Sequence, residues 1–508
     1  MQIIWPEKFG FVSKGQPDGV FVPSGAIATY AQSIAELLTA QNLEPGDRIA
    51  LWLTDGSDKI AAVLGCWMAG VAFCVLPSFA GNTKTERSQN RIQGVFSVLE
   101  PKLLLQGSAD PLSPETYGDI PSITLTGVPP SKPETPDIGS VIAARDAKDL
   151  AFIQFTSGST GGKAKGAEVR FGQLEANLET LAQRTQLTGD DHMVSWAPLY
   201  HDMGLMAVLL ALRAGADLTL METDHFVRRP SAWLEAISKG RGTVTTAPPT
   251  ALKLLTRRRA AEVDLSSLRY AWIGGEAVFP KVVEGFEDAY ADAGLARGVI
   301  QPTYGMAETV VGISCGEPGV PWTTRKEVIS CGKVLDGMEI EIQTADDEPL
   351  PDGTEGRIVT RGPSVIDGYL GLERFEKGAW YDTGDLGFQE DGFLFITGRA
   401  KDLLKRGAES YPATLVETVA EAALELRTGR VAAFAIFRAD QGKEEIVLLV
   451  ESRAWDDQQV RTVAAAVLSE LGLQVDVIRP AKGGRLPRTS SGKLMREMTA
   501  KQYLEGTI

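Results

Sequence analysis

Residues 151–166 read AFIQFTSGSTGGKAKG, a short apolar run that passes directly into glycines, hydroxyl side chains and lysines. The apolar run at 151–155 predicts a buried strand, and the pattern at 171–184 predicts a helix beyond the loop. Glycines let backbone amides turn toward an anion, while hydroxyls and lysines add hydrogen-bond donors and positive charge. This order of strand, loop and helix is typical of a phosphate-binding site. A surface loop that binds nothing is the alternative.

Two common nucleotide-binding patterns do not fit this sequence. A P-loop requires Gly, four residues, and then Gly-Lys followed by Ser or Thr. Counted from Gly158, Lys163 stands where the second glycine should be, and Ala164 follows it where a hydroxyl should hold magnesium. The pair Gly274-Gly275 lacks the GxGxxG spacing of a dinucleotide site. The sequence therefore indicates neither a P-loop nucleotidase nor a dinucleotide-binding domain.

Composition sets the broad class of the protein. The chain has 508 residues, of which 44% are hydrophobic, so two or more domains are expected. Its 51 Lys and Arg against 66 Asp and Glu give a net charge of −15, which opposes nucleic-acid and anionic-membrane partners. Any polyanionic ligand must therefore meet local cations.

Cysteine usage and the N-terminus bear on the compartment. The 4 cysteines and 3 histidines show neither paired metal-ligand spacing nor the density of a secreted disulfide scaffold. The N-terminus lacks the basic region and apolar segment of a signal peptide. The uncharged run at 60–76 is shorter than the roughly 20 residues of a spanning helix, and a buried helix entering a buried strand explains it. We expect a reduced, zinc-free, cytoplasmic protein with no integral membrane segment.

The first part of the chain alternates helix and strand. The spacing of apolar residues at 30–38 predicts a helix, and the apolar run at 48–53 predicts a buried strand. A second helix and strand pair ends at 76, and a further buried strand is expected at 102–105. Such alternation predicts a mostly parallel sheet covered by helices. Residues 111–136, rich in Pro, Ser and Thr, are expected to form a surface loop.

The sequence pattern changes near residue 338. Short alternating strands punctuated by glycines predict a small β-rich subdomain at about 338–398. Mixed helices and strands then return over 403–508, a stretch long enough for a separate domain joined at 399–402. The expected fold is therefore α/β: a large N-terminal domain, 1–398, of parallel-type α/β subdomains plus the β-rich part, followed by a small α+β domain.

Several segments, taken in order, resemble the adenylate-forming enzyme superfamily, which contains acyl-CoA synthetases, fatty acyl-AMP ligases and peptide-synthetase adenylation domains. The segments are TSGSTGGKAKG at 156–166, SWAPLYHDMGL at 195–205, TAPPTA at 246–251, WIGGEA at 272–277, YGMAE at 304–308, YDTGDL at 381–386, GRAKD at 398–402 and PRTSSGKLMR at 487–496. The resemblance covers nearly the whole chain. It implies an adenylation domain, a hinge and a mobile C-terminal domain.

The sequence departs from the family pattern in three places. The segment at 195–205 is most similar to fatty acyl-AMP ligases, yet the insertion that those ligases usually carry is absent from the short connection after Glu308. The loop at 156–166 is one residue longer than the family's TSG-S/T-TG-x-PKG signature, and Ala164 occupies its proline position. Ala307 replaces a hydroxyl residue that many relatives use.

The resemblance implies where the acyl group binds. His201 is expected at the boundary between the acyl pocket and the nucleotide, where it orients the substrate carboxylate. Asp202 falls close to the position at which amino-acid-activating relatives bind the substrate amine, so an amino-acid substrate is the alternative to a mainly apolar acid. The implied acyl-binding residues are Trp196, Tyr200, His201, Asp202, Gly204, Ala247 and Pro248.

The resemblance also implies an ATP site. Tyr304 would offer an aromatic face to the adenine, Glu308 would bind Mg²⁺ against the phosphates, and Asp385 would accept from both ribose hydroxyls. Lys401 is the implied hinge residue, and Lys493 is the lysine that the C-terminal domain brings into the site. The implied ATP- or AMP-binding residues are Thr156, Ser157, Gly158, Ser159, Thr160, Gly161, Lys165, Gly274, Gly275, Glu276, Tyr304, Gly305, Met306, Ala307, Asp385, Ile396 and Arg399.

The expected chemistry is activation of a carboxylic acid to an acyl-adenylate with release of pyrophosphate. The carboxylate must attack the α-phosphate of ATP, so cations placed at the developing charge should dominate catalysis. Lys493, Mg²⁺ on Glu308 and the lysines of the loop are assigned to that task, and His201 to positioning. No general base is required, because the attacking oxygen is already ionised at neutral pH.

Several hypotheses remain open from the sequence. The acyl group is expected to pass to a thiol of CoA or of carrier-protein phosphopantetheine, or the adenylate is delivered to another enzyme. An amino-acid adenylation enzyme that loads a carrier protein is an alternative. A catalytically degenerate adenylate- or nucleotide-binding protein is the hypothesis from another class, and the altered loop and Ala307 motivate it. The joint presence of Glu308, Asp385, Arg399 and Lys493 argues against it, because a binder would need no mobile lysine.

Overall fold

The structure is a computed structural model that describes residues 3–54, 56–77, 86–109, 111–127, 137–156, 164–406, 409–427, 429–438, 443–452, 455–481, 486–488 and 493–508. By its internal contacts the chain divides into two units. Unit 1 comprises Met1–Ile340, Thr360–Tyr381 and Glu390–Phe395, and unit 2 comprises Glu341–Val359, Asp382–Gln389 and Ile396–Ile508.

One sheet of unit 1 has the order β6-β5-β3-β4-β7-β8 within the described residues. Its neighbours are parallel except β7 and β8, which pair antiparallel. The strands are β3 (Arg48–Trp52), β4 (Ala72–Val75), β5 (Leu103–Gly107), β6 (Ser122–Leu125), β7 (Leu150–Thr156) and β8 (Lys165–Arg170). A parallel sheet of this kind needs cover on both faces, because the strand interiors are apolar throughout.

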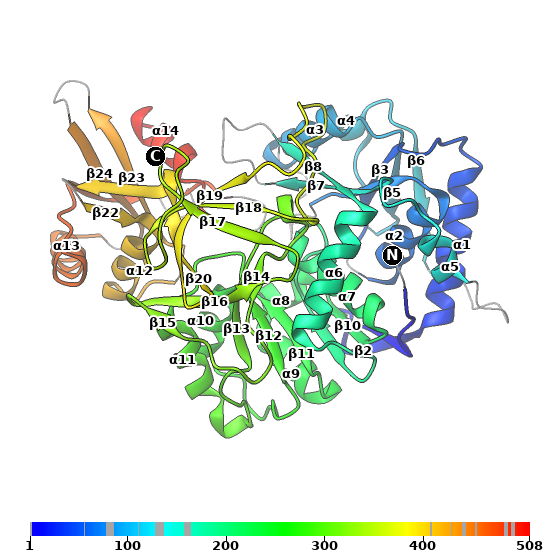
Figure 1. Cartoon of the computed structure of the whole chain (residues 1–508), viewed down its shortest axis with the longest axis horizontal. Coiled ribbons are helices and arrows are strands. Elements are labelled where there is room, and N and C mark those ends of the chain that lie inside the picture. The colour runs from blue at the N-terminus through cyan, green and yellow to red at the C-terminus, as the bar shows by residue number, and fades with distance from the viewer. Residues whose placement is uncertain are drawn as a thin grey trace. The chain divides into compact units, whose positions relative to one another are not determined.

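Helices cover both faces of this sheet, and strand β3 shows how. Ile49 and Leu51 point into a core shared with α1 (Ser24–Thr39) and α2 (Ser57–Ala69), which pack side by side (Figure 1). The alternate residue Ala50 points into a second core, to which α3 (Glu86–Leu99) contributes. This alternation is the period of two that a strand imposes. The short helices α4 (Pro114–Tyr117) and α5 (Ile138–Ala143) complete this part.

A second, longer sheet begins with the strand order β2-β1-β10-β9-β11-β12-β13-β14-β16. The run from β1 to β13 is parallel, and the remaining pairs are antiparallel. The strands are β1 (Lys8–Ser13), β2 (Gln16–Pro23), β9 (His192–Ser195), β10 (Asp217–Met221), β11 (Val244–Ala247), β12 (Tyr270–Ile273), β13 (Ile300–Tyr304), β14 (Ser314–Cys315), β15 (Thr324–Arg325) and β16 (Val328–Val334). Short strands extend the order past β16.

These short strands form the β-rich part of the chain. Beyond β16 the order continues with β20 (Phe393–Arg399), β19 (Tyr381–Glu390), β18 (Gly356–Arg361) and β17 (Glu339–Gln343). The boundaries between the two units fall within these strands. Many turns between these strands contain glycines with positive φ, such as Gly353 and Gly392. The sequence pattern predicted glycine turns between short strands in this region.

Both faces of the longer sheet are covered as well. Along β12, Tyr270 and Trp272 join the core that contains α6 (Phe171–Thr185) and α7 (Asp202–Ala214), whereas Ala271 and Ile273 join the opposite core. That second core receives α8 (Thr223–Arg228), α9 (Ser231–Gly240), α10 (Pro249–Arg257) and α11 (Pro280–Ala289). The carboxyl ends of the parallel strands therefore emerge between two helical layers, the usual place for a ligand site in such a sheet.

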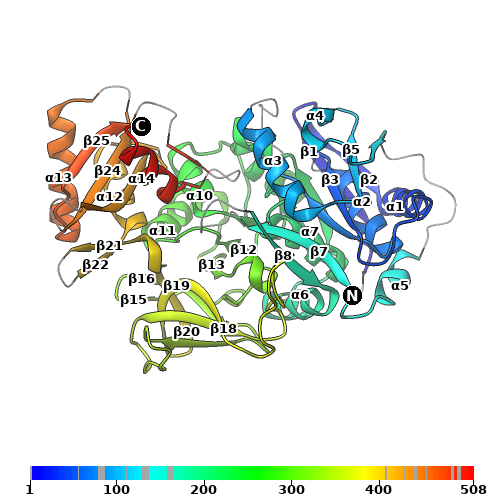
Figure 2. The same cartoon turned by 90° about the horizontal axis from the view of Figure 1, so that it is seen from above.

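Unit 2 contains a small sheet of its own with the order β23-β24-β25 (Figure 2). The part of unit 2 after residue 402 contains β21 (Leu403–Arg406), β22 (Glu409–Pro412), α12 (Ala413–Ala423), β23 (Val431–Arg438), β24 (Lys443–Glu451), α13 (Asp457–Leu471), β25 (Val477–Ala481) and α14 (Arg496–Leu504). Val431 and Ala433 of β23 face α12 and α13, while Phe434 and Ile436 face the side of α14. The strand is buried on both faces, so this part has its own core.

The structure confirms the α/β class and corrects several local predictions. Strands at 48–53, 102–105 and 151–155 are present, as is the helix at 171–184. Helix α1 begins at Ser24, directly after Pro23, which is earlier than the helical spacing at 30–38 indicated. The stretch predicted as a plain surface loop contains α4 and β6 among its described residues.

Two further outcomes concern the loop and the membrane. Strand β8 lies between the glycine-rich loop and α6. The predicted order of strand, loop and helix is therefore wrong at this point, because a second strand follows the loop. None of the described helices combines the length and apolar character needed to span a bilayer. The hinge at 399–402 and the domain limits stay predictions.

A glycine substitution tests the packing of strand β16. Gly332 lies at a bulge with φ of 74°, and a Cβ there would overlap the backbone of Cys315. We expect Gly332→Ala to lower the free energy of unfolding by more than about 3 kcal/mol, since strain and a backbone clash add. Gly378 is the matched control, because its φ is 79° and a Cβ there would meet nothing within 4 Å. Gly378→Ala should cost about 1 kcal/mol in urea unfolding, and equal losses for both variants would contradict the packing argument.

Candidate active site

The turn after β13 carries Glu308. Val310 has a φ of 66°, a costly value for a β-branched residue, and the amide of Val311 donates to the carbonyl of Thr309 at 2.9 Å. These features define a γ-turn two residues beyond Glu308. Gly305 must be glycine here, because a Cβ would overlap the carbonyl of Val311.

A side chain of helix α6 binds the backbone at the end of this turn, at Gly312. Asn177 is fully buried, and its side-chain amide donates to the carbonyl of Gly312 at 2.8 Å. Its side-chain oxygen accepts from the amide of Gly312 at 3.1 Å. The amide of Ile313 donates to the carbonyl of Tyr304 at 2.9 Å and closes the turn. Strain of this kind persists only where the surroundings over-determine it, and it gathers at functional sites.

The carboxylate of Glu308 is buried, with 8% of the residue exposed. Oη of Tyr369 donates to Oε1 of Glu308 at 2.7 Å, and Oη of Tyr381 lies 3.0 Å from Oη of Tyr369. Burial raises the pKa of Tyr369 far above its usual value, and the neighbouring carboxylate and phenol raise it further. The Tyr369 phenol therefore stays protonated and able to donate throughout the neutral range.

The predicted phosphate loop joins β7 to β8. Ser157, Gly158, Ser159, Thr160 and Gly161 lie outside the described residues. The residues at its two ends, Thr156 and Lys165, are cross-strand partners in the β7–β8 pair. Nζ of Lys165 lies 5.1 Å from the centre of the Tyr369 ring, a cation–π distance. The lysine at the end of the loop and the tyrosine that contacts Glu308 are therefore neighbours.

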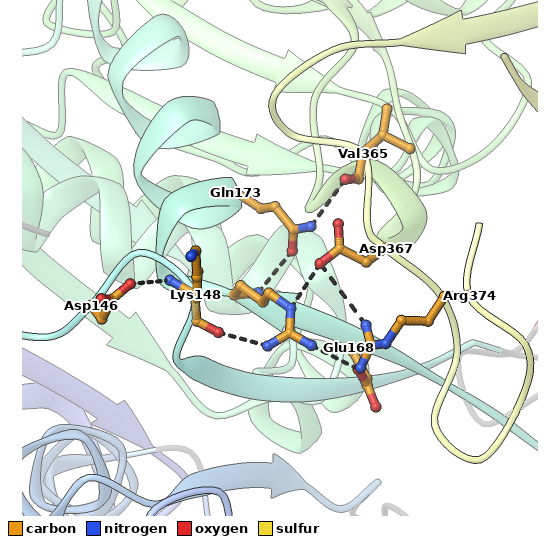
Figure 3. Close-up of polar contacts among 8 residues, drawn as sticks. Asp146, Lys148, Glu168, Gln173, Val365, Asp367 and Arg374 are labelled. Carbon is orange, nitrogen blue, oxygen red and sulfur yellow. Dashed lines mark hydrogen bonds and ion pairs between the residues drawn. The ribbon is translucent and has the colours of Figure 1, made fainter. Parts of the chain in front are cut away.

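A network of ion pairs fixes the clasp, our name for residues 365–375, against β8 (Figure 3). Nε of Arg170 donates to Asp367 at 2.8 Å, and Arg374 donates to Glu168 at 2.8 Å. Figure 3 also shows Asp146, Lys148, Gln173 and Val365 in the same network. Two guanidinium groups and two carboxylates balance in charge. The network therefore sets the position of the clasp, although partly exposed pairs add little stability.

The glycine pair predicted to bind the nucleotide, Gly274-Gly275, lies between three elements. A Cβ on Gly274 would stand 2.6 Å from Oγ1 of Thr303, next to Tyr304, so the close approach requires glycine. Gly275 has a φ of 74° and lies against the side chain of Met203 at the start of α7. Glu276 accepts a hydrogen bond from Oγ1 of Thr250 in α10 at 2.8 Å. This turn therefore joins the predicted nucleotide residues to the predicted acyl segment.

The segment at 195–205 wraps tightly around the start of α7. Gly204 allows this, because a Cβ there would overlap the carbonyl of Pro198. The ring of Tyr200 lies 4.8 Å from that of His201, and the carbonyl of Tyr200 accepts from the side chain of Gln154 at 2.7 Å. Gln154 belongs to β7, so the strand before the phosphate loop contacts the acyl segment directly.

The remaining predicted acyl residues are mostly buried. Trp196 stacks on Phe226 with ring centres 3.6 Å apart and planes 8° from parallel. Ala247 is fully buried at the end of β11, and Pro248 precedes α10. Asp202 accepts from the amide of Met203 at 2.7 Å, at the first turn of α7, where a negative charge complements the helix dipole.

In unit 2, Asp385 and Arg399 form a pair. Asp385 on β19 is 5% exposed, and its Oδ1 accepts from Nε of Arg399 at 2.9 Å. Ile396 lies on the same strand as Arg399, β20. A carboxylate that accepts from a guanidinium keeps capacity for further donors, so Asp385 is suited to a ribose hydroxyl.

Lys493 is exposed and lies on a short connection within unit 2. The described residues near it have defined places: Leu494 forms a β-bridge with Arg488, and α14 starts at Arg496. Arg496 donates to Asp402 at 2.9 Å and to Glu417 at 2.7 Å. Lys401 lies 3.8 Å from Glu497, so the predicted hinge region is tied to the helix that follows Lys493.

The buried partner of this ion network is Glu417. Burial raises the pKa of Glu417, and the adjacent guanidinium of Arg496 opposes that rise. Arg496 has its own pKa raised, because the two carboxylates outweigh its burial. The network therefore depends on all three members, and loss of one would leave a buried charge unpaired.

The described part of unit 1 brings most predicted residues into one connected set. Direct contacts link Lys165 to Tyr369 and Tyr369 to Glu308, and further contacts link the 274–276 turn to α7 and to Thr303. Met306 and Ala307 belong to the turn of Glu308. Sequence reasoning missed Tyr369 and Asn177, because neither lies in a family segment and both act through contacts with distant parts of the chain.

Comparisons with known proteins agree with the resemblance. The family described as AMP-binding enzyme matches residues 25–370. A putative acyl-CoA synthetase of Caulobacter vibrioides is 30% identical over 96% of this chain and 91% of that protein. The medium-chain-fatty-acid–[acyl-carrier-protein] ligase JamA of Moorena producens is also 30% identical, over 98% of this chain and 93% of that protein.

A solved structure gives the same result for the fold. A chain from a structural study of fatty acyl-adenylate ligases from E. coli and L. pneumophila superposes with a TM-score of 0.87 at 27% identity. The match covers 99% of this chain and 96% of that chain. The predicted α/β architecture is therefore confirmed.

Proposed function

This chain belongs to the AMP-binding enzyme family and is an AMP-forming ligase that activates acids as acyl-adenylates, and from this premise we propose its substrate and residue roles. The substrate is a mainly apolar carboxylic acid, and the acyl group passes from the adenylate to a thiol. The observation that carries the assignment of the ATP and magnesium residues is the buried carboxylate of Glu308, which accepts from Tyr369 beside the predicted loop lysine Lys165.

The reaction joins two anions. An oxygen of the substrate carboxylate attacks the α-phosphorus of ATP, the bond from that phosphorus to the β-phosphate oxygen breaks, and pyrophosphate leaves. No proton moves in this step, because the carboxylate is ionised at neutral pH. Placed positive charge is therefore the main requirement, and we assign it to Lys165 and Lys493.

Glu308 suits a magnesium ion that ATP brings with it. Magnesium prefers oxygen ligands and commonly uses one or two carboxylates together with phosphate oxygens. Within the described ranges no group of three or more His, Cys, Asp and Glu side chains could hold a metal ion. One carboxylate with the phosphates as further ligands is the arrangement that fits. When bound there, the ion would reduce the negative charge on the phosphates.

The surroundings of the predicted acyl segment favour an apolar acid. Helix α7 buries the run Leu205–Leu212, and Trp196 packs flat against Phe226. Asp202, the charged residue that would bind a substrate amine, accepts from the backbone at the start of α7 and keeps capacity for a further donor. The buried apolar residues of α7 and Trp196 therefore support an apolar acid, and an amino acid stays the alternative. His201 and Tyr200 are assigned to the carboxylate end of the acyl group.

The acceptor is proposed to be a thiol. By their names, the Moorena relative acylates an acyl-carrier protein and the Caulobacter relative is a putative acyl-CoA synthetase. Both acceptors present the same phosphopantetheine thiol. The shared chemistry is thus an attack of sulfur on the acyl carbon, which forms the thioester and releases AMP.

The residues of unit 2 take roles that their local contacts support. Asp385 and Arg399, already paired, are assigned to the ribose. Lys401 is assigned to the hinge, and Lys493 to the transferring phosphate. Lys493 is exposed and lies three residues before Arg496, whose ion network fixes the start of α14, so the lysine can present its ammonium group without unfolding that helix.

Removal of the Lys493 ammonium group tests the adenylation assignment. We expect Lys493→Ala to abolish acid-dependent exchange of pyrophosphate into ATP, by about a thousandfold or more, since charge stabilisation in the transition state is lost. ATP binding should remain within about threefold, because the lysine acts on the reacting phosphate. Isotope exchange measures the first quantity and calorimetry the second.

Lys501→Ala is the matched control, since Lys501 is an exposed lysine on the following helix, α14. It should exchange at the rate of the unaltered protein. An unchanged exchange rate in Lys493→Ala refutes the assignment. Binding of nucleotide with no exchange by the unaltered protein, across a panel of acids, would favour the degenerate binding protein.

A thiol-acceptor assay tests the second half of the proposal. The protein is incubated with ATP, Mg²⁺ and a straight-chain fatty acid, together with CoA in one reaction and a holo carrier protein in another. We expect a thioester in at least one reaction, because both acceptors offer a thiol, and mass spectrometry identifies it. Accumulation of acyl-adenylate with neither thiol acylated would contradict thiol transfer and favour delivery to another enzyme.

A further inference from the structure

Tyr369 lies outside every segment that the family resemblance singled out, yet it contacts the proposed metal ligand directly. Its hydroxyl group donates to Oε1 of Glu308 at 2.7 Å. It reaches this position from the clasp, which crosses beside β8 rather than belonging to the turn of Glu308. A residue 61 positions away in sequence therefore determines the surroundings of the carboxylate.

The direction of the hydrogen bonds follows from the number of protons. A phenol has one proton, and an ionised carboxylate can only accept. The proton of Tyr369 is therefore directed to Glu308. The contact of 3.0 Å between the two phenol oxygens must then be a hydrogen bond that Tyr381 donates to Tyr369. The result is a chain from Tyr381 through Tyr369 to Glu308, and each bond in such a chain polarises the next.

The backbone on both sides of Tyr369 is fixed to β8. The amide of Leu370 donates to the carbonyl of Gly166 at 2.8 Å, and the amide of Glu168 donates to the carbonyl of Gly368 at 3.3 Å. Tyr369 itself forms a β-bridge with Ala167. The phenol therefore has little freedom to move away from Glu308 unless β8 moves with it.

The ring of Tyr369 also has two close neighbours. Phe375 meets it edge-on at 5.6 Å with planes 88° apart, and Nζ of Lys165 lies 5.1 Å from its centre. Phe375 contacts the ring of Tyr381 at 5.3 Å. Phe375 and Lys165 thus hold the ring that carries the hydroxyl group, and Phe375 also contacts the ring of Tyr381.

We propose that Tyr369 is a positioning residue for Glu308: its hydroxyl group fixes the rotation of the carboxylate so that Glu308 meets magnesium in one orientation. The proposal rests on the proposed function, in which Glu308 binds the magnesium of ATP. A purely space-filling tyrosine would need only its ring, because Phe375 and Lys165 contact the ring. The hydroxyl group is the part that this proposal requires.

The same contacts have a second consequence. Tyr369 contacts two predicted site residues: its ring contacts Lys165 near the end of the predicted phosphate loop, and its hydroxyl group contacts Glu308. The metal ligand and the loop lysine therefore share one support. A displacement of β8 would change both together, which suits a site where a cation and a metal ligand act on the same phosphates.

Deletion of the hydroxyl group tests this proposal. Tyr369→Phe keeps the ring, its packing on Phe375 and its contact with Lys165. We expect the dissociation constant for Mn²⁺, measured by the electron paramagnetic resonance of free Mn²⁺ in the presence of α,β-methylene-ATP, to rise about tenfold or more, as is usual when the partner of a metal ligand is removed. In pyrophosphate exchange the Mg²⁺ concentration for half-maximal rate should rise similarly, and the KM of the acid should stay unchanged.

Two graded variants and one control accompany it. Tyr381→Phe removes only the donor to Tyr369, so we expect a smaller rise of about threefold. It also serves as the second variant should Tyr369→Phe fail to fold, as judged by circular dichroism. Tyr117→Phe removes an exposed phenol hydroxyl group whose contact is with Ser122, and it should bind Mn²⁺ like the unaltered protein.

Glu308→Gln separates failure of this proposal from failure of the function. If Glu308→Gln weakens Mn²⁺ binding while Tyr369→Phe and Tyr381→Phe do not, the positioning role is overturned and the proposed function stands. If Glu308→Gln also binds Mn²⁺ normally, the metal role of Glu308 falls and the positioning role falls with it. Weaker Mn²⁺ binding in Tyr369→Phe, with partial recovery of exchange at high Mg²⁺, is the supporting result.

Discussion

The candidate site in unit 1 depends on keeping one carboxylate buried and oriented. Burial penalises an ionised carboxyl group, so Glu308 needs a hydrogen-bond donor that does not itself ionise. The protonated phenol of Tyr369 meets that need. The turn beneath Glu308 carries a strained residue, Val310, and the buried Asn177 secures it from α6. The backbone of Glu308 is thus held by its turn, and its carboxylate is held by Tyr369 of the clasp.

This constraint explains why distant segments converge. An enzyme that joins two anions cannot rely on its net charge, which here is −15. It must place a few cations and one metal ligand accurately, and accuracy requires rigid support. Strand β8 provides part of that support, because it carries Lys165 at one end and anchors the clasp through the ion pairs of Arg170. In unit 2 the Arg496 network does the same for the connection that bears Lys493.

The sequence predicted elements that local chemistry determines. The apolar run of β7 and the spacing of α6 were sufficient for a strand and a helix, and the ordered segments indicated the family. Strand β8 was missed because its alternating residues follow a glycine-rich loop and resemble the loop more than a strand. Tyr369 and Asn177 were missed for another reason: their partners lie 61 and 135 residues away, and no local pattern reports such a contact.

In the proposed reaction, a carboxylate oxygen of the substrate attacks the α-phosphorus of ATP. The most direct measurement follows that oxygen, using a straight-chain fatty acid labelled with ¹⁸O in both carboxylate positions and a thiol acceptor. We predict that one ¹⁸O atom appears in the phosphate of AMP, seen by mass spectrometry, while pyrophosphate remains unlabelled. Unlabelled AMP, or ADP as the nucleotide product, would contradict this mechanism.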